Sequence, residues 1–310
     1  MISIARENMF PGAVFDTHCH LDYVFRRLQQ QGFLLNRTKE EDWLKAFLQI
    51  DTLDLRDSFG GCVANFCDPR DWCSRRGEDM IRGVVRDSRV FLAIGCHPHF
   101  ADFFRGQELS FLEKLLTSWS LKGSVVAVGE CGLDYSRKNN VSAEKQKKVF
   151  NLQLKLALRL HLPLVLHIRE AEKDGYKALA DANVPSYWPI HRHCFNGSLE
   201  EAEAWLKRFP CSRLGITGLI TFHHAVQLHE VVREIPLDRL LLETDAPYFL
   251  PCQSPGLTKN HPALPGHVVH VAAKVAALKG VTLETVLQSN LEGVAEVYNV
   301  PAVQYYRKSR

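Results

Sequence analysis

Short apolar runs alternate along the chain with longer segments in which apolar residues recur at helical spacing. The runs are nearly continuous, as in strands that are buried on both faces. The first run begins at Val14 and ends in Thr17-His18-Cys19-His20. Further strands are predicted at 62–66, 90–95, 125–129, 164–166, 188–190, either 214–216 or 219–221, and 240–242.

Helices are predicted between these strands. The clearest spans 143–160, where Val149, Leu152 and Leu156 lie on one face. Ser198 and Glu201 form a capping box at the start of another helix. The polar stretch 26–38 has no clear period and is predicted to be a surface loop. The remaining helices are predicted at about 40–58, 75–87, 109–118, 170–182, 226–234, 268–278 and 282–298.

The alternation of strands and helices predicts an α/β fold with a parallel sheet covered by helices. Eight repeats of strand and helix fit a closed (β/α)8 TIM barrel. The alternative is an open doubly wound sheet, which should carry a glycine-rich phosphate loop after its first strand. That strand ends in histidines here, which favours the barrel. Because the chain shows no internal repeat and no linker, we expect residues 1–310 to form a single domain.

The composition limits the kinds of protein that this chain could be. With 46% hydrophobic and 24% charged residues, the chain has ordinary globular composition. A formal net charge of only +3 predicts no strong affinity for polyanions. Nine cysteines without a Cys-x-x-Cys pair are expected to be reduced thiols, typical of an intracellular protein, nuclear or cytoplasmic. No signal peptide or membrane-spanning apolar run is apparent, so we expect a soluble protein.

Histidines and acids follow the predicted strands at their carboxyl ends, where barrel active sites are built. Because alternate strand residues point to the same side, His18 and His20 can aim both imidazoles at one metal ion. Imidazole and carboxylate suit zinc, manganese and similar ions, and a carboxylate can bridge two of them. We therefore predict a site for two divalent ions. The candidate ligands are His18, His20, Glu130, His167, His193 and Asp245, and His97 lies at another strand end.

Each of these residues also has a simpler structural interpretation. A buried histidine is usually a hydrogen-bonded core residue. Glu130 could pair with an arginine, and Asp245, which precedes Ala246-Pro247, could shape a turn. The coincidence of six such residues at successive strand ends favours the metal site.

The same stretches resemble the TatD-type metal-dependent deoxyribonucleases. The motifs that carry the resemblance are Phe15-Asp16-Thr17-His18-Cys19-His20, Gly95-Cys96-His97-Pro98-His99, Gly129-Glu130-Cys131-Gly132-Leu133-Asp134-Tyr135, Leu166-His167-Ile168-Arg169, His193-Cys194-Phe195, Leu242-Glu243-Thr244-Asp245-Ala246-Pro247-Tyr248, Asn260-His261-Pro262 and Asn290. They cover almost the whole chain in the family's order. The resemblance implies an amidohydrolase-like barrel with a divalent-metal site. The stretch 26–38 looks longer than is usual for the family, and 256–259 is a variable approach to Asn260.

The resemblance further implies that His18, His20 and Asp245 hold one ion. Glu130 would then bridge to a second ion, held by His167 and His193. Each position carries the expected residue type. Divalent ions (Mg, Mn or Zn) can activate water and neutralise a phosphodiester, so we predict phosphodiester hydrolysis. Glu130 and Asp245 are the predicted catalytic residues, with Asp245 orienting or deprotonating the water.

Four more residues are candidates around these ligands. His97 and Arg169 lie where a phosphate or leaving group could be contacted. The alternatives are a turn stabilised by Pro98 for His97 and a structural salt bridge for Arg169. Asp134 and Glu243 suit the orientation of metal-bound histidines.

The predicted function is that of a metal-dependent nuclease acting on DNA, with preference for single strands and with RNA and exonucleolytic action left open. A second hypothesis is a barrel hydrolase of a small amide, ester or lactone that uses the same metals. A third is a noncatalytic nucleic-acid-binding module. A basic rim around the cleft would favour the nuclease, and a small closed pocket would favour the second hypothesis. The loss of a metal ligand would favour the third. No oligomeric state is predicted.

Overall fold

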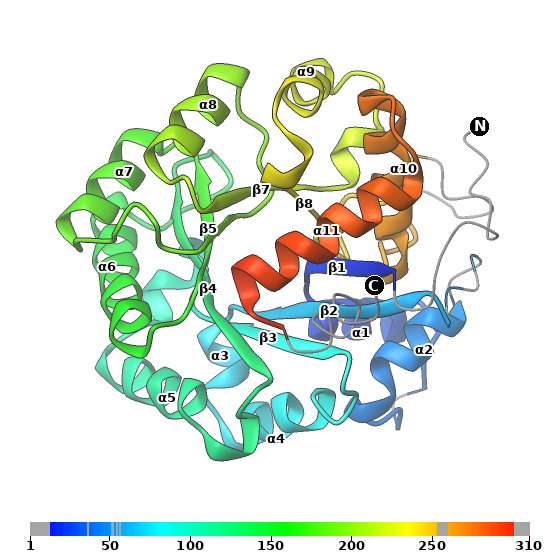
Figure 1. The fold of residues 1–310 in the computed structure, drawn as a ribbon. Coiled ribbons are helices and arrows are strands. Elements are labelled where there is room, and N and C mark those ends of the chain that lie inside the picture. Colours follow the sequence, from blue (N-terminus) through cyan, green and yellow to red (C-terminus); the bar gives the residue numbers. More distant parts are fainter. Residues whose placement is uncertain are drawn as a thin grey trace.

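The strands form the nearly closed (β/α)8 barrel that was predicted (Figure 1). The computed structural model describes residues 13–300 except 36, 51, 52, 54, 56 and 253–259. Each strand pairs in parallel with the next one along the chain. At the seam, His20 N donates to Ala246 O at 2.8 Å and Asp245 N donates to His18 O at 2.9 Å. The strands are β1 (Val14–Cys19), β2 (Phe59–Phe66), β3 (Val90–Ile94), β4 (Val125–Asp134), β5 (Leu164–Arg169), β6 (Ile190–Arg192), β7 (Ser212–Ile216) and β8 (Leu240–Leu242).

Helices surround the strands on the outside of the barrel (Figure 1). None of the helices in the described part of the chain is long and apolar enough to cross a membrane. The helices are α1 (Leu21–Gln30), α2 (Trp43–Ile50), α3 (Pro69–Trp72), α4 (Arg75–Val84), α5 (Gly106–Leu116), α6 (Ala143–Leu160), α7 (Glu172–Asp181), α8 (Leu199–Arg208), α9 (Val226–Glu234), α10 (Val268–Lys279) and α11 (Leu283–Tyr298).

The last helix, α11, crosses one mouth of the barrel instead of lying beside it (Figure 1). Its residues Leu291, Val294 and Val297 are buried in one apolar cluster with side chains from inside the barrel. Two of the largest of those side chains, Phe15 and Phe91, each come from the second residue of their strand. The helix therefore closes the amino end of the barrel, and the carboxyl end is left for the polar residues.

The first part of the chain departs from the sequence prediction. Residues 26–30, expected in a loop, belong to α1, which begins directly after β1. Its buried residues Leu21, Val24 and Leu28 have helical spacing, and reading the stretch from residue 26 hid that period. The helix expected over 40–58 ends at Ile50, and part of its expected second half, like the variable stretch 256–259, lies outside the described residues.

Most strands also differ from their predicted bounds by a few residues: β2 begins three residues earlier and β5 ends three residues later than expected. β4 continues past Glu130 to Asp134, because Cys131 and Gly132 pair with β5 after a register shift. β6 begins at Ile190, where the predicted strand ends. The seventh strand is the first of the two alternatives, because residues 218–221 form a 3-10 helix. These corrections move Glu130 from the end of its strand into a paired strand.

Candidate metal centre

Two histidines at the end of β1 form one wall of the site. His18 and His20 are buried, and their Nε2 atoms lie 3.3 Å apart. His20 Nδ1 lies 3.1 Å from the carbonyl oxygen of Asn65 on β2. A carbonyl only accepts, so Nδ1 carries the proton and the Nε2 lone pair faces the site.

Asp245 approaches these histidines from the loop after β8. Its Oδ1 lies 3.2 Å from His20 Nε2 and 3.6 Å from His18 Nε2. The preceding residue, Thr244, is fixed by Asp16, which accepts hydrogen bonds from its backbone N at 2.9 Å and its Oγ1 at 2.6 Å. The seam of the barrel thus places the Asp245 carboxylate against the two histidines.

Glu130 lies at the centre, and its two carboxylate oxygens face different groups of histidines. Oε2 is 3.5 Å from His18 Nε2 and 3.7 Å from His20 Nε2. Oε1 is 2.8 Å from His167 Nδ1 and 3.5 Å from His193 Nε2. The carboxylate is buried, so each oxygen depends on these partners.

His97 joins the second group, because its Nε2 also lies 3.5 Å from Glu130 Oε1. The sequence placed His97 at a possible substrate contact, and the structure puts it among the possible metal ligands. Its Nδ1 accepts a hydrogen bond from the backbone N of His99 at 3.1 Å, so the turn at Pro98 is present as well.

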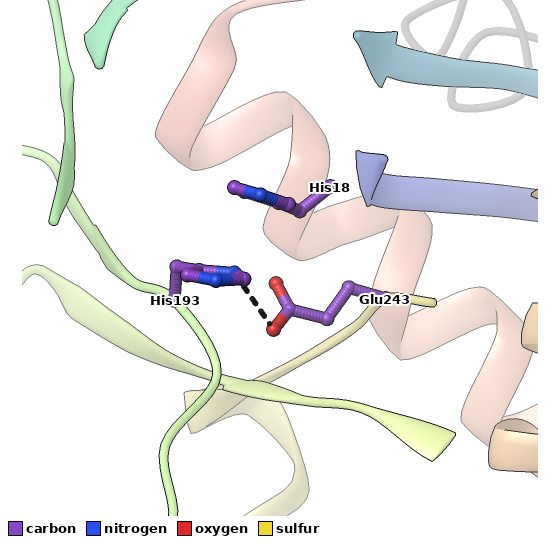
Figure 2. A group of neighbouring side chains, drawn as sticks. All are labelled: His18, His193 and Glu243. Carbon is purple, nitrogen blue, oxygen red and sulfur yellow. Dashed lines mark ion pairs between the residues drawn. The ribbon is translucent and has the colours of Figure 1, made fainter. Parts of the chain in front are cut away.

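Two further carboxylates hold histidines of the second group from behind. Asp134 Oδ2 lies 3.2 Å from His167 Nε2 and 2.8 Å from His99 Nε2. Glu243 Oε1 lies 3.1 Å from His193 Nδ1, the contact dashed in Figure 2. Asp134 and Glu243 were predicted to orient histidines. His99 was not singled out, although its place two residues after His97 was a signal for it.

The His18 and His193 rings are stacked, with centroids 3.6 Å apart and planes 17° apart (Figure 2). Burial lowers the pKa of His18 to about 4, and the neighbouring His193 adds to that effect. Burial also lowers the pKa of His193, but the carboxylates of Glu243 and Glu130 outweigh it and raise that pKa to about 9. The pKa values of the two stacked rings are therefore shifted in opposite directions.

The pKa of Glu130 is shifted in the opposite direction to that of His193. Burial raises its pKa, but the imidazoles of His193 and His97 outweigh burial and hold the pKa well below its usual range. Protons shared between imidazoles and carboxylates occupy positions that divalent cations take in metal sites.

The donor set fits divalent metal ions. The ligand atoms in each of several groups lie within 4.8 Å of one another, and buried His18 Nδ1 has no hydrogen-bond partner among the described residues. Imidazole and carboxylate suit zinc and manganese. The groups are His18, His20 and Glu130; His97, Glu130 and His167; His193, Cys194 and Asp245; and His18, His193 and Glu243.

Arg169 lies two residues beyond His167 on β5. It ends β5 as a half-buried side chain, and it forms no ion pair with any carboxylate of the described residues. The structural salt bridge considered for it is therefore absent from that part of the chain.

A (β/α)8 barrel with histidines and carboxylates at the carboxyl ends of its strands is typical of metal-dependent hydrolases. The family model described as TatD related DNase matches residues 15–299. The chain belongs to this family.

Named relatives and a solved structure agree with this assignment. The chain is 38% identical over 286 residues to the 3'-5' RNA nuclease TATDN2 of Homo sapiens, covering 92% of this chain but only 35% of that protein. It is 38% identical over 212 residues to the 3'-5' ssDNA/RNA exonuclease TatD of Erwinia billingiae, covering 67% of this chain and 77% of that protein. The crystal structure of the TatD homolog YJJV from Escherichia coli superimposes with a TM-score of 0.74 at 26% identity, over 94% of this chain and 99% of that one.

Proposed function

We propose that this protein is a metal-dependent nuclease that hydrolyses phosphodiester bonds of single-stranded nucleic acid from an end. DNA is the proposed main substrate, and RNA is a second one. The observation that carries the proposal is the position of Glu130, with one oxygen toward His18 and His20 and the other toward His167 and His193. Relatives named as exonucleases of single-stranded DNA and RNA support the substrate class.

Two divalent ions would occupy the site, one on each side of Glu130. His18, His20 and Asp245 would hold the first. His167 and His193 would hold the second, with His97 as an additional ligand on that side. Mg, Mn and Zn all suit these donors.

When bound, such ions supply hydroxide near neutral pH and neutralise charge on the phosphodiester oxygens. Asp245 reaches both histidine groups, since its Oδ1 lies 3.2 Å from His20 Nε2 and its Oδ2 lies 3.9 Å from His193 Nε2. Its carboxylate is therefore placed to orient the attacking water and to accept its proton. Asp134 and Glu243 accept protons of His167 and His193 and so keep their other nitrogens turned toward Glu130.

Two side chains near the metal centre suit a nucleic-acid strand. Arg169 has no carboxylate partner among the described residues and is available for a phosphate. The ring of Tyr248 is 45% exposed and lies 6.3 Å from the ring of His20. An exposed aromatic ring beside the metal centre can stack on an unpaired base, which favours single-stranded substrate.

The test is cleavage of end-labelled single-stranded DNA and RNA of matched sequence, with Mg, Mn or Zn. We expect metal-dependent shortening from one end, abolished by EDTA and by Glu130→Ala. Glu113→Ala, which removes an exposed carboxylate paired with Arg159, is the matched control and should cleave normally. Failure of the folded, metal-loaded protein to cleave either strand would overturn the proposal and favour hydrolysis of a small amide, ester or lactone.

A further inference from the structure

A line of buried polar groups continues from the metal centre into the barrel. Glu243 is fully buried, and its Oε1 contacts His193 Nδ1 at 3.1 Å and accepts a hydrogen bond from Cys194 N at 2.7 Å. Its second oxygen, Oε2, lies 2.9 Å from His191 Nε2. His191 is itself fully buried on β6.

The line ends on the helix that closes the amino end of the barrel. His191 Nδ1 lies 2.5 Å from the hydroxyl of Tyr298, the last residue of α11. That hydroxyl also lies 3.4 Å from the carbonyl oxygen of Thr17, directly before His18. The proposed ligand His193 is therefore connected to α11 through successive contacts with Glu243, His191 and Tyr298.

The neighbouring strand leaves room for this arrangement. Gly215 on β7 faces the contact between His191 and Glu243. A Cβ atom added there would lie 2.5 Å from His191 Nε2 and 2.6 Å from Glu243 Oε2, closer than real Cβ contacts. Any larger residue at this position would push the pair apart.

The chemistry of these contacts indicates which nitrogen of each histidine carries a proton. A histidine that binds a metal through Nε2 carries its proton on Nδ1 and donates it to a carboxylate or carbonyl. Glu243 can hold His193 in this way only if its own orientation is fixed. Its second oxygen faces His191 Nε2 at 2.9 Å, and because a carboxylate only accepts, the proton that this contact requires is on Nε2. His191 Nδ1 then faces the Tyr298 hydroxyl, whose single proton can go to this nitrogen or to the carbonyl oxygen of Thr17.

We propose that His191 and Tyr298 are positioning residues that act on the metal centre through Glu243. They hold the Glu243 carboxylate in the orientation that turns the His193 Nε2 toward Glu130. The inference rests on the proposed role of His193 as a metal ligand, and neither residue touches metal or substrate itself.

The experiment measures metal binding in four variants by competition of Zn with a chromophoric chelator. Partners that orient metal-bound histidines change metal affinity by about 10–100-fold. We expect a loss of that size in His191→Leu and a smaller loss in Tyr298→Phe. His191→Gln keeps an amide near the Nε2 position and should recover most of the affinity. His229→Leu, which removes a buried histidine whose Nε2 lies 2.8 Å from the carbonyl oxygen of Ile220, is the matched control and should bind as wild type.

A second measurement separates positioning from general damage to the fold. The visible spectrum of the Co-substituted protein reports ligand geometry, and it should change in Tyr298→Phe. It should remain unchanged in Tyr176→Phe, which alters a tyrosine of α7 that packs beside Trp205. Wild-type Zn affinity and an unaltered Co spectrum in Tyr298→Phe would overturn the inference. Tyr298→Phe alone decides the matter if His191→Leu does not fold, because it removes a single oxygen atom.

The failure of the proposed function gives a different result. A wild-type protein that binds Zn but cleaves no nucleic acid would refute the nuclease, and the affinity losses of the variants would still support the positioning role. A wild-type protein that binds no divalent ion would overturn both.

Discussion

The two ends of the barrel are built from the same eight strands but from opposite kinds of side chain. At the amino end, Phe15 and Phe91 pack with Leu291 and Val294 of α11 into an apolar cluster. At the carboxyl end, buried histidines surround the buried carboxylate of Glu130. Burial of apolar side chains stabilises the fold, whereas burial of charged groups opposes it unless they are paired. The amino end therefore supports the fold, and the carboxyl end is available for chemistry.

The largest effect should follow from Asp245→Asn, which tests the carboxyl end. The amide cannot accept the proton of the attacking water, so we expect turnover to fall by about 10²–10⁴-fold. The free energy of unfolding should change by only about 1 kcal/mol, since the shape of the side chain is kept. Initial rates on labelled single-stranded DNA and urea unfolding measure the two quantities. Turnover within tenfold of wild type would remove Asp245 from the reaction.

Leu291→Ala makes the reciprocal test at the amino end. Removing this buried side chain from the apolar cluster should lower the free energy of unfolding by about 3 kcal/mol, through lost burial and the cavity left behind. Turnover per folded molecule and Zn affinity should remain at wild-type values. A loss of Zn affinity comparable to that expected for His191→Leu would mean that the two ends are not independent.

The sequence singled out candidate ligands that the fold brings together, but it gave wrong bounds for several of the strands that carry them. His18, His167 and Asp245 were proposed because each follows an apolar run, and the barrel brings such positions to one end. The extension of β4 past Glu130 was missed because Gly129 and Gly132 are poor strand signals. The β-propensity of this segment taken alone is low, and it does not include the pairing with β5 that stabilises the strand.

Contacts between distant parts of the chain were beyond the sequence. His191 and Tyr298 are 107 residues apart, and no local pattern links a strand histidine to a tyrosine at the end of a helix. His97 could be placed near the site from its strand end, but only the fold shows its distance from Glu130. Local patterns therefore indicated which residues are candidates for the chemistry, and the three-dimensional structure was needed to show which other residues they contact.

The smallest predicted effect is the dependence of Zn affinity on pH, which tests the charge at the carboxyl end of the barrel. The carboxylates around His193 raise its pKa to about 9. In the metal-free protein, protonated His193 therefore stabilises the fold, and this contribution is complete below about pH 6.5, the pKa of an unperturbed histidine. The contribution is lost as the pH rises through about 9. A metal ion must displace this proton, so Zn affinity should rise by about tenfold per pH unit between pH 7 and 8 for each proton released. Chelator competition at several pH values measures the slope.

The apolar end supplies the control for this dependence. Leu291 does not titrate, so Leu291→Ala should lower stability equally at pH 7 and pH 8 and leave the slope of Zn affinity unchanged. Glu243→Gln removes one of the two carboxylates that most raise the pKa of His193, and it should reduce the slope. A Zn affinity that stays constant from pH 7 to 8 in the wild-type protein would mean that His193 is already neutral before metal binds. In that case the carboxyl end would not hold the charge that distinguishes it from the amino end.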